Sequence, residues 1–363
     1  MRIIVTKDNL VSALSKAVRA SSARPAMPIM GNILFEATAD KLTLTATDAE
    51  ITIKTWIPAL VEEEGSTTLP AKKMQQIVAA LPNADVTIYT DENEVSTITC
   101  KKSTFKVHGI ASSDYPEIKE PEYDLSFSMK VQDIIRSFTK VVYARSTDDS
   151  RKQLNGVVMS IRGGIMTVAA TDGRRLAIME KNIEDENAKD GDYILPSRAS
   201  TELSSCLDGT DNVLISLNRS DVSFQSANTM LKTKLVDGSY PNFRQVIPEN
   251  CGNTVSIPRG EFTEALKRVS LIVNDSGDSV KLTFSQNNLL IYASSVETGE
   301  SSESMEIAYE GEEVSVSFNP VYFTDPLKVM EADTINIEFG KQYTPIKLTG
   351  DEGFLYMLMP MKG

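Results

Sequence analysis

Residues that could act as acids, bases or metal ligands are few and widely spaced in this sequence. Three pairs of neighbouring carboxylates could hold Mg²⁺. They are Asp48 with Glu50, Asp91 with Glu92, and Asp148 with Asp149. Turn and surface roles explain these pairs better, and the presence of a single histidine, His108, argues against histidine-based catalysis. We therefore expect no catalytic residue, no metal site and no cofactor.

Motifs that mark nucleotide, metal or hydrolase sites are absent from the sequence. It has no P-loop, no Rossmann glycine pattern, no H-E-x-x-H and no G-x-S-x-G. Gly163-Gly164 and Asp172-Gly173 are each typical of a hairpin turn, because Gly and Asp tolerate positive φ. These absences favour a binding protein. A metal-dependent nuclease or phosphoryl-transfer enzyme using the carboxylates, and a scaffold that binds only proteins, are the alternatives.

Composition and charge indicate an ordinary globular chain of two to three domains. The 363 residues are 41% hydrophobic and carry a net charge of −13. No apolar run approaches the roughly 18–20 residues that a membrane span needs. Residues 1–5 lead directly into a strand-then-helix pattern, which is not a secretion signal. Cys100, Cys206 and Cys251 are few and far apart, so we expect a cytoplasmic protein without disulfides or membrane contact.

The chain repeats one pattern three times, at a spacing of about 125 residues. Leu69-Pro70-Ala71-Lys72 recurs as Leu195-Pro196-Ser197-Arg198, and more loosely as Phe318-Asn319-Pro320. Ala46-Thr47-Asp48-Ala49 likewise matches Ala170-Thr171-Asp172-Gly173. This period is too long for a solenoid repeat, so each copy is interpreted as a domain.

Each copy is expected to contain an opening strand, a helix, a strand meander, a second helix and closing strands. Alternating apolar and polar residues indicate half-buried antiparallel sheets, and the class is α+β. The expected domains are 1–121, 126–249 and 253–363, joined by linkers at 117–125 and 247–254. The expected helices are 7–20, 70–81, 129–145, 196–207, 259–273 and 319–331.

Positive charge is concentrated in these expected helices. Together they carry about +7, whereas the remaining chain carries about −20. A solvated basic face would explain any one helix, but six suggest phosphate binding without base reading. Lys16 and Lys140 are expected to face away from the apolar stripes of their helices. The candidate DNA-facing residues in the helices are Lys7, Lys16, Arg19, Lys72, Lys73, Lys140 and Arg198.

These features resemble the bacterial DNA polymerase III beta subunit family, the sliding clamps. The resemblance covers essentially the whole chain and is specific at residues 171–176, 240–246 and 359–362. It implies a DNA-clamp fold of three repeated domains, each with two helices packed on antiparallel sheets. It also implies a ring-shaped, head-to-tail homodimer around duplex DNA, a non-catalytic processivity factor. Further DNA contacts implied by the resemblance are Arg24, Arg151, Lys152 and Gln153.

The resemblance also implies a pocket for partner peptides. The implied partners are the replicative polymerase alpha subunit, the clamp-loader delta subunit and other proteins with a motif containing Gln and a Leu-Phe-type end. Flexible methionines suit such a groove, although a Met-Pro-Met tail could also be buried packing. Arg174 departs from the His that relatives often carry. The pocket residues carried over are Leu154, Thr171, Gly173, Arg174, Arg175, Leu176, Pro241, Val246, Tyr322, Met357, Met359, Pro360 and Met361.

Two predicted edge strands carry opposite charge and could join two copies of the chain. A basic strand lies in the first repeat and an acidic stretch in the third, and unpaired edges of opposite charge invite pairing. Simple solvated edges are the alternative. The candidate dimer-interface residues are Lys101, Lys102, Phe105, Lys106, Val107, Leu271, Ile272, Glu297, Glu300 and Glu303.

Overall fold

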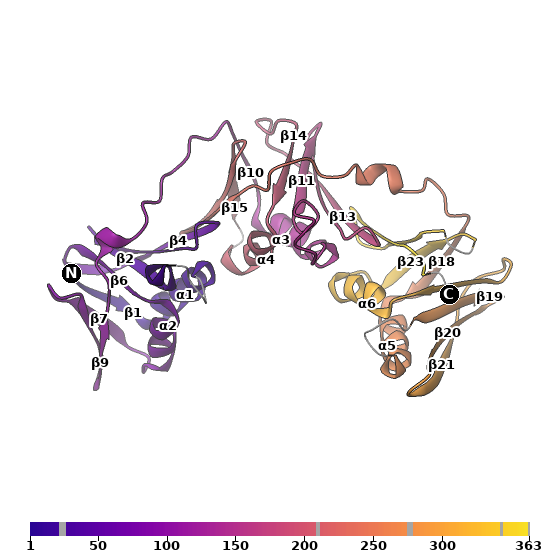
Figure 1. Ribbon diagram of the computed structural model, residues 1–363, viewed down its shortest axis with the longest axis horizontal. Coiled ribbons are helices and arrows are strands. Elements are labelled where there is room, and N and C mark those ends of the chain that lie inside the picture. The colour runs from indigo at the N-terminus through magenta and orange to yellow at the C-terminus, as the bar shows by residue number, and fades with distance from the viewer. Residues whose placement is uncertain (22–26, 208–210, 274–278, 342–343, 362–363) are drawn as a thin grey trace. The chain divides into compact units, whose positions relative to one another are not determined.

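The computed structural model describes residues 1–21, 27–207, 211–273, 279–341 and 344–361. The chain forms two compact units, each assembled from separate segments (Figure 1). Unit 1 comprises Met1–Ile135, Ile183–Lys189 and Arg198–Leu235. Unit 2 comprises Arg136–Asn182, Asp190–Ser197 and Val236–Gly363. Each unit therefore combines one terminal repeat with part of the middle repeat.

Unit 1 is built on two antiparallel sheets. Its strands are β1 (Arg2–Thr6), β2 (Asn32–Thr38), β3 (Lys41–Thr47), β4 (Ile51–Pro58), β5 (Leu60–Glu63), β6 (Gly65–Pro70), β7 (Asp85–Thr90), β8 (Val95–Cys100), β9 (Ser103–His108), β10 (Leu125–Lys130), β15 (Asn212–Leu217), β16 (Asp221–Ser226) and β17 (Thr229–Lys234). The larger sheet has the order β10-β15-β16-β17-β4-β3-β2-β6, and the smaller has the order β5-β1-β7-β8-β9. β9 therefore forms one edge of the smaller sheet.

Unit 2 repeats this plan. Its strands are β11 (Val157–Arg162), β12 (Ile165–Thr171), β13 (Arg175–Asn182), β14 (Gly191–Leu195), β18 (Asn253–Pro258), β19 (Val280–Ser285), β20 (Asn288–Ser295), β21 (Gly299–Glu306), β22 (Val314–Phe318), β23 (Thr334–Phe339), β24 (Ile346–Thr349) and β25 (Phe354–Leu358). The larger sheet has the order β14-β11-β12-β13-β25-β24-β23-β18, and the smaller has the order β21-β20-β19-β22. Here β21 forms an edge.

Helices are found at all six expected places. They are α1 (Lys7–Ala17), α2 (Ala71–Ala80), α3 (Val131–Thr139), α4 (Ser197–Cys206), α5 (Arg259–Val269) and α6 (Pro320–Val329). α1, α3 and α5 end earlier than expected, and each is followed by a short 3₁₀ turn. At the start of α6, the Asn319 side chain accepts the Val321 amide at 2.9 Å, and Pro320 occupies a position whose N–H has no helical partner.

The helices pack on the sheets through apolar stripes. α1 lies against α2 and β4, and α5 lies against α6 and β20 (Figure 1). Leu10 and Leu14 of α1 are fully buried, as are Phe262 and Leu266 of α5. Phe262 meets Phe323 of α6 edge to face, with ring centroids 5.6 Å apart. The predicted α+β class with antiparallel sheets is confirmed.

The large sheets join neighbouring repeats edge to edge. In unit 1 the last strand of the second repeat, β17, pairs with β4 of the first, and Leu231 lies opposite Ile53. In unit 2 the last strand of the third repeat, β25, pairs with β13 of the second, and Tyr356 lies opposite Ala177. Repeats within a unit therefore share a continuous hydrogen-bonded sheet, and we call these two pairings the first and second joints.

Candidate functional site

The same turn geometry occurs beside both joints. The Asp48 carboxylate accepts the backbone amides two and three residues further on, at 3.1 and 2.9 Å. The Asp172 carboxylate does the same at 2.8 and 3.0 Å. Such carboxylate-capped turns explain why both positions carry Asp, as the sequence interpretation of Asp172 proposed. Asp48, one of the carboxylates that could have been a metal ligand, is therefore used to hold backbone.

A tyrosine hydroxyl braces each turn from a following segment. The amide of the threonine before the Asp donates to Tyr115 at 3.2 Å in the first turn, and to Tyr240 at 3.1 Å in the second. Burial raises the pKa of Tyr115 to about 12, although the bond from the Thr47 amide partly offsets it. Burial also raises the pKa of Tyr240. Both hydroxyls therefore stay neutral and hold the turns at physiological pH.

The two joints differ in the polarity of their paired side chains. Across the first joint Thr52 lies opposite Lys232, whereas across the second Leu176 lies opposite Met357. Two residues further along, the backbone is alike in both joints. The Lys234 amide donates to the Glu50 carbonyl at 3.2 Å, and the Met359 amide donates to the Arg174 carbonyl at 2.8 Å. One backbone frame thus carries polar side chains in unit 1 and apolar side chains in unit 2.

An apolar pocket of about 320 Å³ opens at the second joint. It is formed by the start of β13, the end of β25 and the 3₁₀ turn Phe243–Val246. Its lining residues are Leu154, Thr171, Gly173, Arg174, Arg175, Leu176, Pro241, Asn242, Phe243, Val246, Met357, Leu358 and Met359. Gly173 has a φ of +89°, which glycine adopts without strain. Ten of the thirteen residues predicted for the peptide pocket line it.

Three predicted pocket residues lie elsewhere in unit 2. Tyr322 is on α6, and its ring lies 4.7 Å from the guanidinium carbon of Arg175. Pro360 is absent from the lining, and the Met361 amide donates to Ser317 of β22 at 2.7 Å. Asn242, Phe243 and Leu358 were missed. Of these three, Phe243 could have been predicted, because it is an aromatic residue close to the Tyr240-Pro241 motif.

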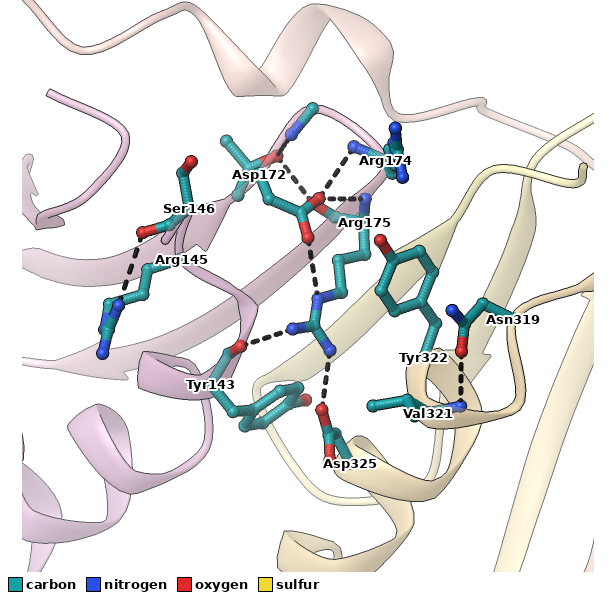
Figure 2. Close-up of polar contacts among 12 residues, drawn as sticks. Tyr143, Arg145, Ser146, Asp172, Arg174, Arg175, Asn319, Val321, Tyr322 and Asp325 are labelled. Atoms are coloured by element: carbon teal, nitrogen blue, oxygen red, sulfur yellow. Dashed lines mark hydrogen bonds and ion pairs between the residues drawn. The ribbon is translucent and has the colours of Figure 1, made fainter. Parts of the chain in front are cut away.

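Arg175 ties the pocket wall to α6 (Figure 2). Its guanidinium donates to Asp172 at 3.1 Å, to Asp325 at 2.8 Å and to the Tyr143 carbonyl at 2.7 Å. Burial alone would lower the pKa of Arg175, but the bond to Asp325 and the neighbouring carboxylates raise it overall. The side chain is 10% exposed and its charge is matched by two carboxylates. Arg175 therefore positions the pocket wall, and its charge is already compensated.

Two of the predicted DNA-facing lysines do not face solvent, so the expected orientation is wrong for both. Lys16 is 5% exposed and donates to the Thr229 hydroxyl at 3.1 Å. Lys140 is 1% exposed and pairs with the Asp351 carboxylate, while Glu331 lies 3.6 Å away. Hairpins of the following repeat cover the helix faces opposite the apolar stripes. A helical wheel shows only which face packs on the helix's own sheet, so it could not predict that these hairpins bury the opposite face.

Other predicted DNA-facing residues differ in how freely they present charge. Arg19 pairs with Glu202 at 2.8 Å, Arg198 pairs with Asp48, and Lys7 donates to the Leu81 carbonyl. Arg151 lies 3.6 Å from Asp148, and the Gln153 amide is 3.5 Å from the Asp237 carbonyl. Among the predicted DNA-facing residues that the structure describes, Lys72, Lys73 and Lys152 are exposed and have no carboxylate partner. Arg24 lies outside the described residues.

The candidate dimer residues lie on or beside two sheet edges. Phe105 and Val107 are on edge strand β9, where Phe105 is 37% exposed and Val107 is buried. Lys106 is also on β9, and Lys101 and Lys102 form the turn before it. On the other edge, Glu300 and Glu303 are on β21, Leu271 and Ile272 are in the 3₁₀ turn after α5, and Glu297 precedes β21. Glu303 already pairs with Arg268 at 2.6 Å, and Leu271 is 82% exposed.

None of the described helices combines the length and apolar character that crossing a bilayer requires. Among the described residues, no three His, Cys, Asp or Glu side chains gather as a metal site.

Three family models for the DNA polymerase III beta subunit match the chain. The N-terminal domain model matches residues 1–119, the central domain model residues 128–242 and the C-terminal domain model residues 244–362. The beta sliding clamp of Chlamydia muridarum is 30% identical over 100% of this chain and 99% of its own length. That of Bacillus subtilis is 28% identical over 100% of both chains.

Solved structures agree with these matches. The crystal structure of the DNA polymerase sliding clamp from Bacillus subtilis superposes with a TM-score of 0.93 at 27% identity, over 100% of this chain and 99% of that one. A sliding clamp from Pseudomonas aeruginosa bound to griselimycin gives a TM-score of 0.94 at 25% identity, over 100% of both chains.

Proposed function

Because this chain belongs to the DNA polymerase III beta subunit family, we propose that it is a DNA sliding clamp, a non-catalytic factor that encircles duplex DNA and confers processivity. The match of all three domain models along the chain carries this proposal. We further propose that residues 1–121, 126–249 and 253–363 are its three clamp domains and that it acts in the cytoplasm. Its closed form is a head-to-tail homodimer.

The two internal joints support a specific way of joining two copies. In the first and second joints, the third residue of the closing strand lies opposite Ile53 and Ala177 respectively. Each of these is the cross-strand partner of an alanine, Ala46 or Ala170, at the sixth residue of the preceding strand. The third repeat has the same arrangement, since Ala293 is the sixth residue of β20 and lies opposite Ser301. The rule is that the residue opposite the sixth-position alanine pairs with the third residue of a closing strand. On β21 this residue is Ser301.

The closing strand of the first repeat is β9, whose third residue is Phe105. Applied to β9, the rule places Phe105 opposite the partner's Ser301 and Lys106 opposite the partner's Glu300. Lys106 and Glu300 are both exposed on their own edges, so the faces agree. Opposite charges directly across an antiparallel pair stabilise it by roughly 0.2–1 kcal/mol. The exposed Phe105 and Leu271 would supply apolar contact beside this pair.

DNA contact is proposed to be weak and without base reading. Lys72 and Lys73 on α2, together with Lys152, present unpaired exposed charge, and phosphate binding by such residues falls steeply with salt. Arg19, Arg151, Arg198 and Lys7 share their charge or hydrogen bonds with the protein itself. Retention on DNA would then come from closure around the duplex, and few strong contacts would oppose sliding.

Partner peptides are proposed to enter the pocket at the second joint. Its apolar lining and the half-exposed Met359 and Val246 at its edge suit a short peptide with an apolar end. The proposed ligands are segments of the replicative polymerase alpha subunit, the clamp-loader delta subunit and other proteins with such a motif.

Topological retention tests the central proposal. The protein would be loaded by a clamp loader and ATP onto nicked circular duplex, isolated by gel filtration, and challenged with a single-cutting restriction enzyme. We expect the protein to stay on uncut circles and to leave the linear product. Equal retention on circular and linear DNA, or no retention on circles after loading, would contradict a clamp.

A further inference from the structure

Two consecutive arginines, Arg174 and Arg175, border the pocket but differ in their exposure and in their ion pairs. Arg175 is 10% exposed and paired with Asp172 and Asp325, as described above. Arg174 is exposed, and within the described residues its guanidinium makes no ion pair or hydrogen bond. Figure 2 shows its side chain directed away from the cluster around Arg175. One charge is compensated inside the protein, and the other is presented at the pocket.

The fold does not require an arginine at position 174. Its backbone amide is bound by Asp172 at 2.8 Å, and its carbonyl accepts the Met359 amide at 2.8 Å. The matching turn in unit 1 makes the same two backbone bonds and carries an exposed Glu50 at this position. Because the same turn forms with either sign of charge, the arginine is free to serve binding.

The surroundings of Arg174 determine what it would bind. The pocket lining contains two cations and no acidic side chain, and the charge of Arg175 is already neutralised. The remaining lining is mainly apolar, including Leu154, Leu176 and Met357. An occupant with an apolar end and a carboxylate beside it would match both features at once. An uncompensated cation beside apolar surface favours an occupant of this kind, because a carboxylate can accept hydrogen bonds from its guanidinium while the apolar end fills the pocket.

We propose that Arg174 is a specificity-determining residue that selects partner peptides carrying an acidic side chain next to their apolar end. This inference rests on the proposed peptide pocket and adds the chemistry of its preferred ligand. Charge complementarity carries it, because the lining offers one uncompensated positive charge. The expected preference for an acidic over an isosteric neutral peptide is about fivefold, near the upper end for an exposed ion pair.

The test uses three fluorescein-labelled peptides that differ at one residue. Each ends in Leu-Phe, has Gln at its start, and carries Glu, Gln or Lys immediately before the apolar end. Their dissociation constants for the full-length protein are measured by fluorescence anisotropy in about 50 mM and about 300 mM NaCl. The variant Arg174→Glu is suitable because Glu50 occupies the equivalent turn. The control is Arg162→Glu, which changes an exposed arginine of β11 outside the pocket lining.

In the native protein we expect the Glu peptide to bind about fivefold more tightly than the Gln peptide, with a smaller ratio at high salt. Arg174→Glu should reverse the order so that the Lys peptide binds best, while Arg162→Glu should keep the native order. Circular dichroism and thermal melts verify that each variant is folded. Arg174→Gln is the second variant, and it should remove the preference without reversing it.

The outcomes separate this inference from the proposed function. If all three peptides bind the native protein equally, or the order survives Arg174→Glu, the role of Arg174 is refuted while the pocket stands. If no peptide binds at any salt concentration, the pocket assignment fails and this inference fails with it.

Discussion

Replacing Lys140 by Met is expected to destabilise unit 2 strongly, because it removes one partner of a buried ion pair. Lys140 and the side chain of Asp351 are 1% and 2% exposed and pair directly. Removing one member of such a pair costs about 3–5 kcal/mol. Asp351 would still accept the amides of Ala332 at 2.7 Å and Glu331 at 3.1 Å, so we expect the lower end, about 3 kcal/mol.

The assay exploits the single tryptophan of the chain. Trp56 is on β4 in unit 1, whereas the Lys140–Asp351 pair is in unit 2. Urea unfolding followed by far-ultraviolet circular dichroism should shift for Lys140→Met, while the Trp56 fluorescence transition reports on unit 1. The matched control is Arg162→Gln, which breaks the exposed pair with Asp192 in unit 2 and should cost less than about 1 kcal/mol.

The pH dependence of this loss has a definite sign. Burial alone would raise the pKa of Asp351, but bonds from Lys140 and from the Ala332 and Glu331 amides lower it overall. A carboxylate with a lowered folded-state pKa stabilises above its unfolded pKa, near 3.9, and loses this contribution as pH falls through the folded value. The deficit of Lys140→Met should therefore be equal at pH 7 and pH 5.5 and shrink below about pH 4.

A double-mutant cycle with Asp351→Asn decides whether the pair itself is responsible. The two single variants should not be additive, and their interaction free energy should exceed about 1 kcal/mol. A Lys140→Met variant as mild as Arg162→Gln, or an additive cycle, would refute the energetic importance of the buried pair.

Two further predictions concern the proposed DNA and dimer surfaces. The double variant Lys72→Gln, Lys73→Gln should weaken direct binding to short linear duplex in anisotropy titrations. The slope of log K against log salt should fall by about 2, because each unpaired cation contributes about one released counterion. An unchanged slope would remove α2 from the DNA surface. Lys106→Glu and Glu300→Lys should each shift the monomer–dimer equilibrium toward monomer in sedimentation equilibrium. The double variant should regain the dimer, because the two charges are exchanged. Failure of the double variant to recover the dimer would contradict the proposed register.

Much of the architecture could be predicted from the sequence because it repeats. The recurring Leu-Pro and Ala-Thr-Asp segments located α2 and α4 and the turns beside both joints. The basic strand predicted in the first repeat corresponds to β9, the acidic stretch predicted in the third includes β21, and the structure places both strands at sheet edges. Local signals were sufficient here because helix starts and hairpin turns depend on residues close in sequence.

Long-range pairing was beyond such local patterns. Lys16 and Lys140 appear as solvent-facing residues on their helices, but a hairpin from the next repeat covers each. The partners of Lys140 lie far along the chain, at Glu331 and Asp351, so no spacing rule could indicate them. The pocket was located through a family resemblance, while its third wall at Phe243 depends on how a 3₁₀ turn folds back on β13 and β25.

The edge-to-edge joints have a consequence for synthesis on the ribosome. β4 is complete once residue 58 has emerged, yet its neighbour β17 ends only at residue 234. β13 similarly waits for β25, which ends only at residue 358. Exposed strand edges are prone to aggregation, so a truncated product lacking β25 would leave β13 bare. In the proposed dimer β9 waits for a second polypeptide, which makes quaternary assembly the final step of maturation.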